Sequence, residues 1–320
     1  MSQKKCHTVH VGNNLQNCPD LKVHGNKMEN SKQETYLGDK IDMSGRIKPT
    51  ILSRISKGYG AISNILAITN EVPLAHWRIE AGLKLRQAMF LNGTLFNSEA
   101  WQGISPGEIE MIEKVDEDLL RGLLKAHSKI PLEALYLETG CIPVRFIIKS
   151  RRLSYLHTIL QKDPEELVKE VFEAQKNDPT AGDFFNLVMD DCNLVDMNMT
   201  ENEISTMKKD KYKEIVKSKV RQSAFQYLKE TQQKHSKVKT ISYGSKLIIA
   251  DYLKSLLFNS DNAETLLALR TRTVRGIRND LSGMYNTLTC PLGCTELDTL
   301  PNLLSCKVLK AELKADSVTQ

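Results

Sequence analysis

The sequence has little of what several protein classes require. Seven cysteines are scattered over 320 residues, and aromatic residues make up only 6% of the chain. An odd, scattered set of cysteines does not provide a disulfide framework, so free thiols are expected. No stretch approaches the ~18 consecutive apolar residues of a membrane-spanning helix, and the opening residues MSQKKCHTVH lack the apolar core of a secretory signal. We therefore expect an intracellular protein, nuclear or cytoplasmic, without a membrane partner.

The composition is otherwise that of a globular protein. Hydrophobic residues account for 41% and charged residues for 26%, with 17 glycines and 10 prolines. These values exclude collagen-like and wholly disordered chains. At roughly 150 residues per domain, the length allows one large domain or two small ones.

The first forty-odd residues contain short β-rich runs separated by glycine and asparagine turns. The runs cover residues 6–11, 21–24 and 35–41. Glycine and asparagine accept positive φ angles at low steric cost, which favours tight turns between strands. We predict a small antiparallel sheet, which needs a covering helix or partner because three short strands are marginal alone.

From residue 46 onward the sequence predicts helices. Ser105 and Glu108, with a proline between them, form a capping box, as do Thr200 and Glu203. Asp163 with Glu166, and more weakly Asp261 with Glu264, repeat this pattern. One apolar stripe at helical spacing consists of Ile109, Ile112, Val115, Leu119 and Leu123. The expected helices cover residues 46–71, 74–100, 105–127, 131–139, 143–162, 164–176, 200–234, 244–257 and 262–284.

These features predict a mainly α fold, a multi-helix bundle preceded by a small N-terminal antiparallel β piece. We expect a β segment over 1–45, a helical domain over 46–177, a loop or linker over 178–199, a basic helical subdomain over 200–286 and a cysteine-bearing tail over 287–320. The linker carries Pro179 and Gly182 and is expected to hold one short helix.

Positive charge is concentrated between Lys208 and Lys254. This segment holds thirteen lysines and arginines against four acids, an excess of nine, whereas the whole chain carries a net charge of +5. Such a basic helix suits the phosphate backbone of a nucleic acid, and a solvated helix face is the alternative. Interleaved aromatic residues are candidates for base stacking or for the core; they are Tyr212, Phe225, Tyr227 and Tyr243.

A second basic set follows near residue 270. Arg272, Arg275 and Arg278 recur every three residues after Arg270 and share one helix face, with Asp280 as the only acid before Asn286. The planar guanidinium suits phosphate.

Two groups of residues have metal-binding character. Cys290, Cys294 and Cys306 have finger-like spacing, but a zinc site takes four ligands and no histidine follows His235. Asp190 and Asp191 resemble a magnesium pair, yet the sequence offers no flanking strands and no third carboxylate. We therefore expect no cofactor, with zinc at the three cysteines as the one alternative.

Specific strings along the chain resemble one known family. They are KKCHTVHVG at 4–12, LKVH at 21–24, ETYLG at 34–38, RISKGYG at 54–60, NG at 92–93, SEA at 98–100, YLETG at 136–140, PVRF at 143–146, RRL at 151–153, CPLGC at 290–294 and DTL at 298–300. In this order they resemble the end of the palm, the primer grip, the thumb and the zinc-knuckle-like tail of reverse transcriptases from non-LTR (LINE-type) retrotransposons.

The resemblance implies an RNA-directed DNA polymerase as the parent activity. Residues 1–45 would be a palm remnant, with Lys4 or Lys5 near the incoming nucleotide and Tyr36, Leu37 and Gly38 at the primer end. The helices would form a thumb that closes on an RNA or RNA/DNA duplex, and the missing palm and fingers would be a partner. The family's polymerase carboxylates lie upstream of the primer grip, so magnesium belongs only to the complete parent enzyme. Asn302 stands where the tail usually has histidine, which makes the zinc-knuckle-like tail degenerate.

Two functions follow as hypotheses. The first is a truncated reverse-transcriptase-like protein that binds nucleic acid without polymerising. Its expected contacts are Lys4, Lys5, Tyr36, Leu37, Gly38, Lys208, Lys209, Lys213, Lys217, Arg221, Arg272, Arg275 and Arg278. The second is a helical protein-interaction module without a nucleic-acid role, which would expose apolar residues where the palm once covered the small sheet.

Overall fold

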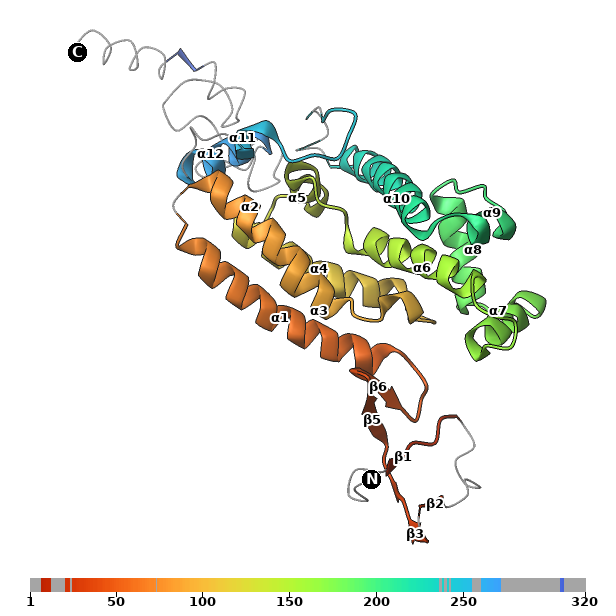
Figure 1. The fold of residues 1–320 in the computed structure, drawn as a ribbon. Helices are drawn as coiled ribbons and strands as arrows, with labels where there is room; N and C mark the ends of the chain where they lie inside the picture. Colours follow the sequence, from red (N-terminus) through yellow and green to blue (C-terminus); the bar gives the residue numbers. More distant parts are fainter. Residues whose placement is uncertain are drawn as a thin grey trace. The chain divides into compact units, whose positions relative to one another are not determined.

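The computed structural model describes residues 7–12, 21–23, 25–72, 74–235, 238, 241, 243–254, 260–271 and 306–307. It is mostly helical, as the sequence predicts, with small β elements near the N-terminus (Figure 1). The chain divides into two compact units. Unit 1 comprises Met1–Asn64, Leu85–Asp116 and Pro143–Ser223, and unit 2 comprises Ile65–Lys84, Glu117–Ile142 and Ala224–Gln320. Both units are assembled from segments that alternate along the sequence.

The β elements of unit 1 are short strand pairs. The pairs are β1 (His7–Thr8) with β4 (Glu29–Asn30), β2 (Lys22–Val23) with β3 (Asn26–Lys27), and β5 (Gln33–Tyr36) with β6 (Asp39–Asp42). The last two pairs are antiparallel, but β1 and β4 run parallel, which the sequence did not predict. The single strand expected over 35–41 is instead the β5–β6 hairpin. Leu37 and Gly38 at its tip have φ angles of 48° and 89°, as a tight two-residue hairpin turn requires.

Helix α1 (Lys48–Asn70) follows the hairpin, which lies at its N-terminal end (Figure 1). One face of the helix is buried, at residues 51, 54, 58, 62, 65 and 69, with the spacing of an amphipathic helix. Gly58 lets its neighbours approach closely, because a Cβ there would lie 3.0 Å from Thr94 Oγ1 and 3.1 Å from Phe90. The expected helix over 46–71 is confirmed.

The single helix expected over 74–100 is interrupted. It consists of α2 (Ala75–Leu85), a π-helical segment (Arg86–Leu91), α3 (Asn92–Thr94) and a 3₁₀ turn (Ser98–Ala100). In the π-helical segment, Arg86 donates two hydrogen bonds of 2.6 Å to the buried carboxylate of Asp116. Asn97 has a left-handed backbone, which ends the helical path before the 3₁₀ turn.

Helix α4 (Pro106–Leu124) begins at the predicted capping box, where Ser105 and Glu108 exchange backbone-to-side-chain hydrogen bonds. The predicted apolar stripe is confirmed, since Ile112, Val115, Leu119 and Leu123 are fully buried. In unit 1, α6 (Val144–Leu160) packs against α7 (Leu167–Asn177), α8 (Phe184–Leu194) and α9 (Glu201–Thr206) (Figure 1).

Two helix predictions in unit 1 need correction. The helix expected over 200–234 is divided into α9 and α10 (Lys209–Gln232). The break lies at Met207, whose backbone is extended and whose carbonyl oxygen lies 2.8 Å from His157 Nε2. Helix α7 begins at Leu167 rather than 164, because residues 163–166 form a turn closed by a hydrogen bond from the Glu166 amide to the Asp163 carbonyl. The Thr200–Glu203 capping box is present.

Unit 2 has its own core around α5 (Leu132–Thr139). Side chains from α5, α11 (Asp251–Lys254) and α12 (Ser260–Arg270) belong to one buried cluster, together with Phe225 and Leu247. The helix expected over 244–257 is wrong for its first part, because residues 243–250 are non-helical. Of the helix expected over 262–284, α12 extends to Arg270, and residues 272–284 lie outside the described part of the chain.

Candidate nucleic-acid interface

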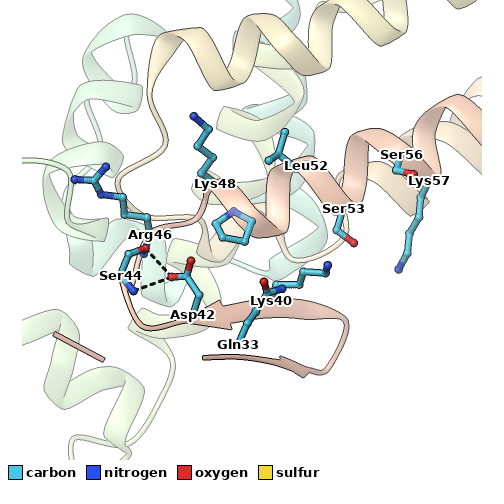
Figure 2. Close-up of a pocket in the computed structure, with 11 residues that line it drawn as sticks. Gln33, Lys40, Asp42, Ser44, Arg46, Lys48, Leu52, Ser53, Ser56 and Lys57 are labelled. Atoms are coloured by element: carbon cyan, nitrogen blue, oxygen red, sulfur yellow. Dashed lines mark hydrogen bonds between the residues drawn. The ribbon is translucent and has the colours of Figure 1, made fainter. Parts of the chain in front are cut away.

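A basic groove lies in unit 1 between the β5–β6 hairpin and the first turns of α1 (Figure 2). Its volume is about 800 Å³. The lining residues, which define the basic groove from here on, are Gln33, Lys40, Asp42, Ser44, Arg46, Lys48, Pro49, Leu52, Ser53, Ser56 and Lys57.

The charge of the basic groove is mainly positive. Four of its side chains are cationic, namely Lys40, Arg46, Lys48 and Lys57, and Asp42 is the one carboxylate among them. The Asp42 carboxylate is fixed by a neighbour in the sequence, because it accepts hydrogen bonds from the Ser44 amide (2.9 Å) and hydroxyl (2.6 Å), drawn as dashed lines in Figure 2. In the described part of the chain, no ion pair joins the four cations to a carboxylate. They are therefore available to an anionic ligand.

The hairpin wall of this groove is fixed to the helical part of unit 1. The Thr50 hydroxyl bonds the backbone of Lys40, accepting from its amide (2.8 Å) and donating to its carbonyl (3.1 Å). Arg54 forms a 2.7 Å ion pair with Asp39, and its guanidinium lies 5.0 Å from the centre of the Phe96 ring. Asp39 also accepts a hydrogen bond from the Asn97 side chain at 3.0 Å. These contacts hold the wall in one position relative to α1.

The predicted primer-end residues occupy the tip of the same hairpin. Tyr36 and Leu37 are exposed (64% and 71%), and Gly38 is partly buried. A Cβ at Gly38 would lie 3.3 Å from Arg54 Nη2, so the tip tolerates little bulk there. None of the three residues lines the basic groove. The structure therefore places them beside it on one hairpin.

The predicted basic helix is α10, and its charges point outward. Its buried positions recur every four residues from Tyr212 through Val216 and Val220. The predicted contact residues Lys208, Lys209, Lys213 and Lys217 are all exposed, whereas Arg221 is half-buried. Lys219 on the same helix pairs with Asp196 at 3.7 Å. No α10 residue lines the basic groove, so unit 1 carries two separate basic surfaces.

The aromatic residues interleaved in this segment belong to the core. Tyr212 is fully buried, donates a hydrogen bond to the Leu153 carbonyl (3.1 Å) and stacks on His157. Burial, with a smaller effect from Cys192, raises the pKa of Tyr212. Phe225 is also buried. Of the two alternatives for these residues, the core is therefore the one observed for Tyr212 and Phe225.

The aspartate pair on α8 does not have the character of a magnesium site. Asp191 is fully buried and lies between Lys149 (2.6 Å) and Arg152 (3.1 Å). These two cations offset its charge, which disfavours a bound metal cation. Asp190 is exposed on the same helix. Among the residues that the structure describes, no group of three or more His, Cys, Asp or Glu side chains could hold a metal ion.

Several predicted site residues lie outside the described part of the chain. They are Lys4, Lys5, Arg272, Arg275, Arg278, Cys290 and Cys294. Cys306 is described and is a buried free thiol. The zinc alternative and the second arginine set therefore stay predictions.

Sequence reasoning missed the four cations of the basic groove. Lys40 follows the hairpin turn, Arg46 and Lys48 flank the start of α1, and Lys57 lies further along that helix. Residues 39–57 hold five lysines and arginines against two aspartates, an excess of three that is much smaller than the excess of nine over 208–254. They come together only because the hairpin folds back against α1.

Comparison of the chain with protein-family models, curated proteins and solved structures gives no match. The likeness to non-LTR reverse transcriptases therefore rests on the sequence strings alone. Among the helices in the described residues, none combines the length and the apolar character needed to cross a membrane.

Proposed function

We propose that this protein binds nucleic acid through the phosphate backbone, with the basic groove as the contact surface. The observation that carries the proposal is four cationic side chains around one groove, opposed by a single carboxylate that is already hydrogen-bonded to Ser44. Lysine and arginine side chains displace the counterions that surround phosphates, and this release drives binding. The exposed lysines of α10 offer a second contact of the same kind.

The proposed ligand is an RNA or an RNA–DNA primer–template. This choice rests on the resemblance to non-LTR reverse transcriptases and on the exposed Tyr36–Gly38 tip beside the basic groove. We propose binding without polymerisation by this chain. The aspartate pair on α8 supports this, because Asp191 is buried between Lys149 and Arg152.

A protein-interaction module is the second candidate, favoured by a different observation. Apolar side chains near the hairpin are exposed, including Tyr36, Leu37, Ile41 and, on α1, Leu52. Tyrosine and leucine side chains in this setting suit a protein partner as well as a nucleic acid. The first candidate is expected to bind RNA and the second is not, so an RNA-binding assay distinguishes them.

The test is fluorescence anisotropy of a labelled RNA–DNA primer–template, titrated with the purified chain from 50 to 300 mM salt. Three variants each remove two positive charges: Lys40→Gln with Lys57→Gln in the groove, Lys213→Gln with Lys217→Gln on α10, and Lys162→Gln with Lys176→Gln as the control. The control lysines are ion-paired with Glu166 and Glu201 and line no part of the groove.

We expect the groove variant to reduce the slope of log affinity against log salt by about 1.4 to 1.8, the value for two lost phosphate contacts. The control variant should leave the slope unchanged. Absence of binding at 50 mM salt would contradict the proposal and favour the protein-interaction candidate. Equal effects of all three variants would also contradict it, because they would reflect net charge rather than a groove.

A further inference from the structure

A second pocket lies in unit 2 and shares no lining residue with the basic groove. Its volume is about 420 Å³, within the range of small-molecule sites. Its apolar walls come from Leu137, Phe225 and Leu266, and its cations are Lys246 and Arg270. The remaining lining residues are Tyr243, Gly244, Ile248, Ile249, Ala250, Asp251 and Tyr252.

Arg270 is oriented in this pocket by three neighbours. Its Nε donates a 2.9 Å hydrogen bond to Glu138 Oε1, and its guanidinium lies 5.8 Å and 5.6 Å from the ring centres of Tyr243 and Tyr252. Arg270 also donates a hydrogen bond to the Tyr243 hydroxyl oxygen. About a third of the side chain is exposed. A guanidinium has five N–H donors, so the fork of Arg270 offers more donors than these two contacts use.

Hydrogen bonds connect Glu138, the partner of Arg270, to the 243–250 segment. Glu138 is fully buried, and its Oε1 also accepts a 2.9 Å hydrogen bond from the Tyr243 hydroxyl. The Glu138 carbonyl accepts a 2.8 Å hydrogen bond from the Ala250 amide, which fixes the 243–250 segment to α5. Gly140 permits this contact, because its φ is +66° and a Cβ there would lie 2.5 Å from the Ile248 backbone. These contacts hold one wall of the pocket against α5.

The free donors and the second cation point to an oxyanion. Arginine donates two parallel hydrogen bonds to phosphate or carboxylate, and these charge-assisted bonds are strong. Lys246 is exposed at the same pocket, and Asp251, the one carboxylate in the lining, has a cationic neighbour in Lys254 at 3.4 Å. Because Glu138 already offsets the charge of Arg270, Lys246 supplies the uncompensated positive charge, and the N–H donors of both side chains suit the several oxygens of a phosphate monoester. The apolar walls suit an uncharged body attached to it.

We propose that the unit 2 pocket binds the phosphate monoester of a nucleotide, with Arg270 and Lys246 on the phosphate. The same chemistry occurs in a free nucleoside 5′-monophosphate and at the 5′-phosphorylated end of a strand. This site is independent of the basic groove, because no residue lines both.

The experiment is isothermal titration of the full chain with adenosine 5′-monophosphate, adenosine and inorganic phosphate. Lys246→Gln removes an exposed cation, Arg270→Lys keeps the charge and removes the fork, and Lys234→Gln is the control, an exposed unit 2 lysine outside the pocket lining. We expect the monophosphate to bind, and adenosine to bind at least about 10-fold more weakly. Lys246→Gln and Arg270→Lys should each weaken the monophosphate by a similar factor, and Lys234→Gln by less than about 2-fold.

Equal affinity for adenosine and its monophosphate would overturn the proposal, as would absence of binding at millimolar concentration. Unchanged affinity in Lys246→Gln would overturn it even if Arg270→Lys fails to fold, since Lys246 is exposed. Competition by a 5′-phosphorylated oligonucleotide, but not by its 5′-hydroxyl form, would support the site and identify the strand end as its ligand. Binding of the free monophosphate without such competition would support it with the nucleotide as the ligand. The groove variants keep monophosphate binding in either case, so failure of one proposal is distinguishable from failure of the other.

Discussion

The ion pair between Asp39 and Arg54 gives the sharpest test of how the fold of unit 1 supports the basic groove. The Arg54 side chain is 5% exposed and that of Asp39 is 24% exposed. Asp39→Asn keeps the shape but leaves the guanidinium without its counter-charge. Breaking a buried pair in this way costs about 3–5 kcal/mol. Since Asp39 is a quarter exposed and water compensates in part, we expect about 2–3 kcal/mol.

This cost should appear first as local opening of the hairpin. The backbone amides of β5 and β6 are expected to exchange hydrogen about 30 to 150 times faster, by the rule that 1.36 kcal/mol is tenfold. Hydrogen exchange followed by mass spectrometry on peptides covering residues 33–42 measures this directly. Lys162→Gln, which breaks an exposed pair with Glu166, is the control and should leave exchange of these peptides unchanged.

For Asp39→Asn, we expect a change in nucleic-acid affinity opposite to the one that net charge alone would cause. Asp39→Asn adds one net positive charge, which alone would tighten binding of a nucleic acid. If the hairpin must be held in place to form the groove wall, affinity for the primer–template should instead fall. Exchange rates within about 3-fold of the unaltered protein would refute the structural reasoning. Tighter binding by Asp39→Asn would refute the claim that the groove depends on this ion pair.

Four further outcomes are expected. Burial raises the pKa of Tyr212 above its ordinary 10.0. The contribution of this group to the unfolding free energy is therefore complete below pH 10 and falls by about 1.4 kcal/mol per pH unit above it. In urea unfolding, Tyr212→Phe should reduce the loss of unfolding free energy above pH 10 by this amount. Burial raises the pKa of Cys192 to about 11. At pH 8 the folded protein should therefore be alkylated by iodoacetamide at Cys192 about 100-fold more slowly than an ordinary thiol of pKa 9.0, and in denaturant the two rates should be equal. Peptide mapping measures the extent of alkylation. Gly140→Ala should cost at least about 2 kcal/mol in unfolding free energy, because the residue has φ +66° and the Ile248 backbone blocks a side chain; a loss below 0.5 kcal/mol would contradict this. Thr200→Ala should cost about 1 kcal/mol by removing the α9 cap, and Thr200→Ser should restore most of it.

Local patterns in the sequence predicted much of the helical structure. The capping boxes at Ser105 and Thr200 mark helix starts because the hydrogen bonds involved span only three residues. The apolar stripe of α4 likewise depends only on helical spacing. The helix expected over 200–234 was placed wrongly where a distant contact intervenes. The break at Met207 coincides with its carbonyl contact to His157, fifty residues earlier in the chain.

For the candidate site, the sequence by itself determined that α10 is a basic helix. Its lysines are exposed because they lie at other positions around the helix than its buried apolar residues. The turn at Leu37 and Gly38 was not predicted from the residue pattern, because the expected strand over 35–41 runs through it. Only the tertiary structure decided that Lys40 and Lys57 line one groove and that Asp191 is buried between two cations. Charges that are separated along the chain become one site only when long-range contacts, such as Arg54 with Asp39, fix the distance between them.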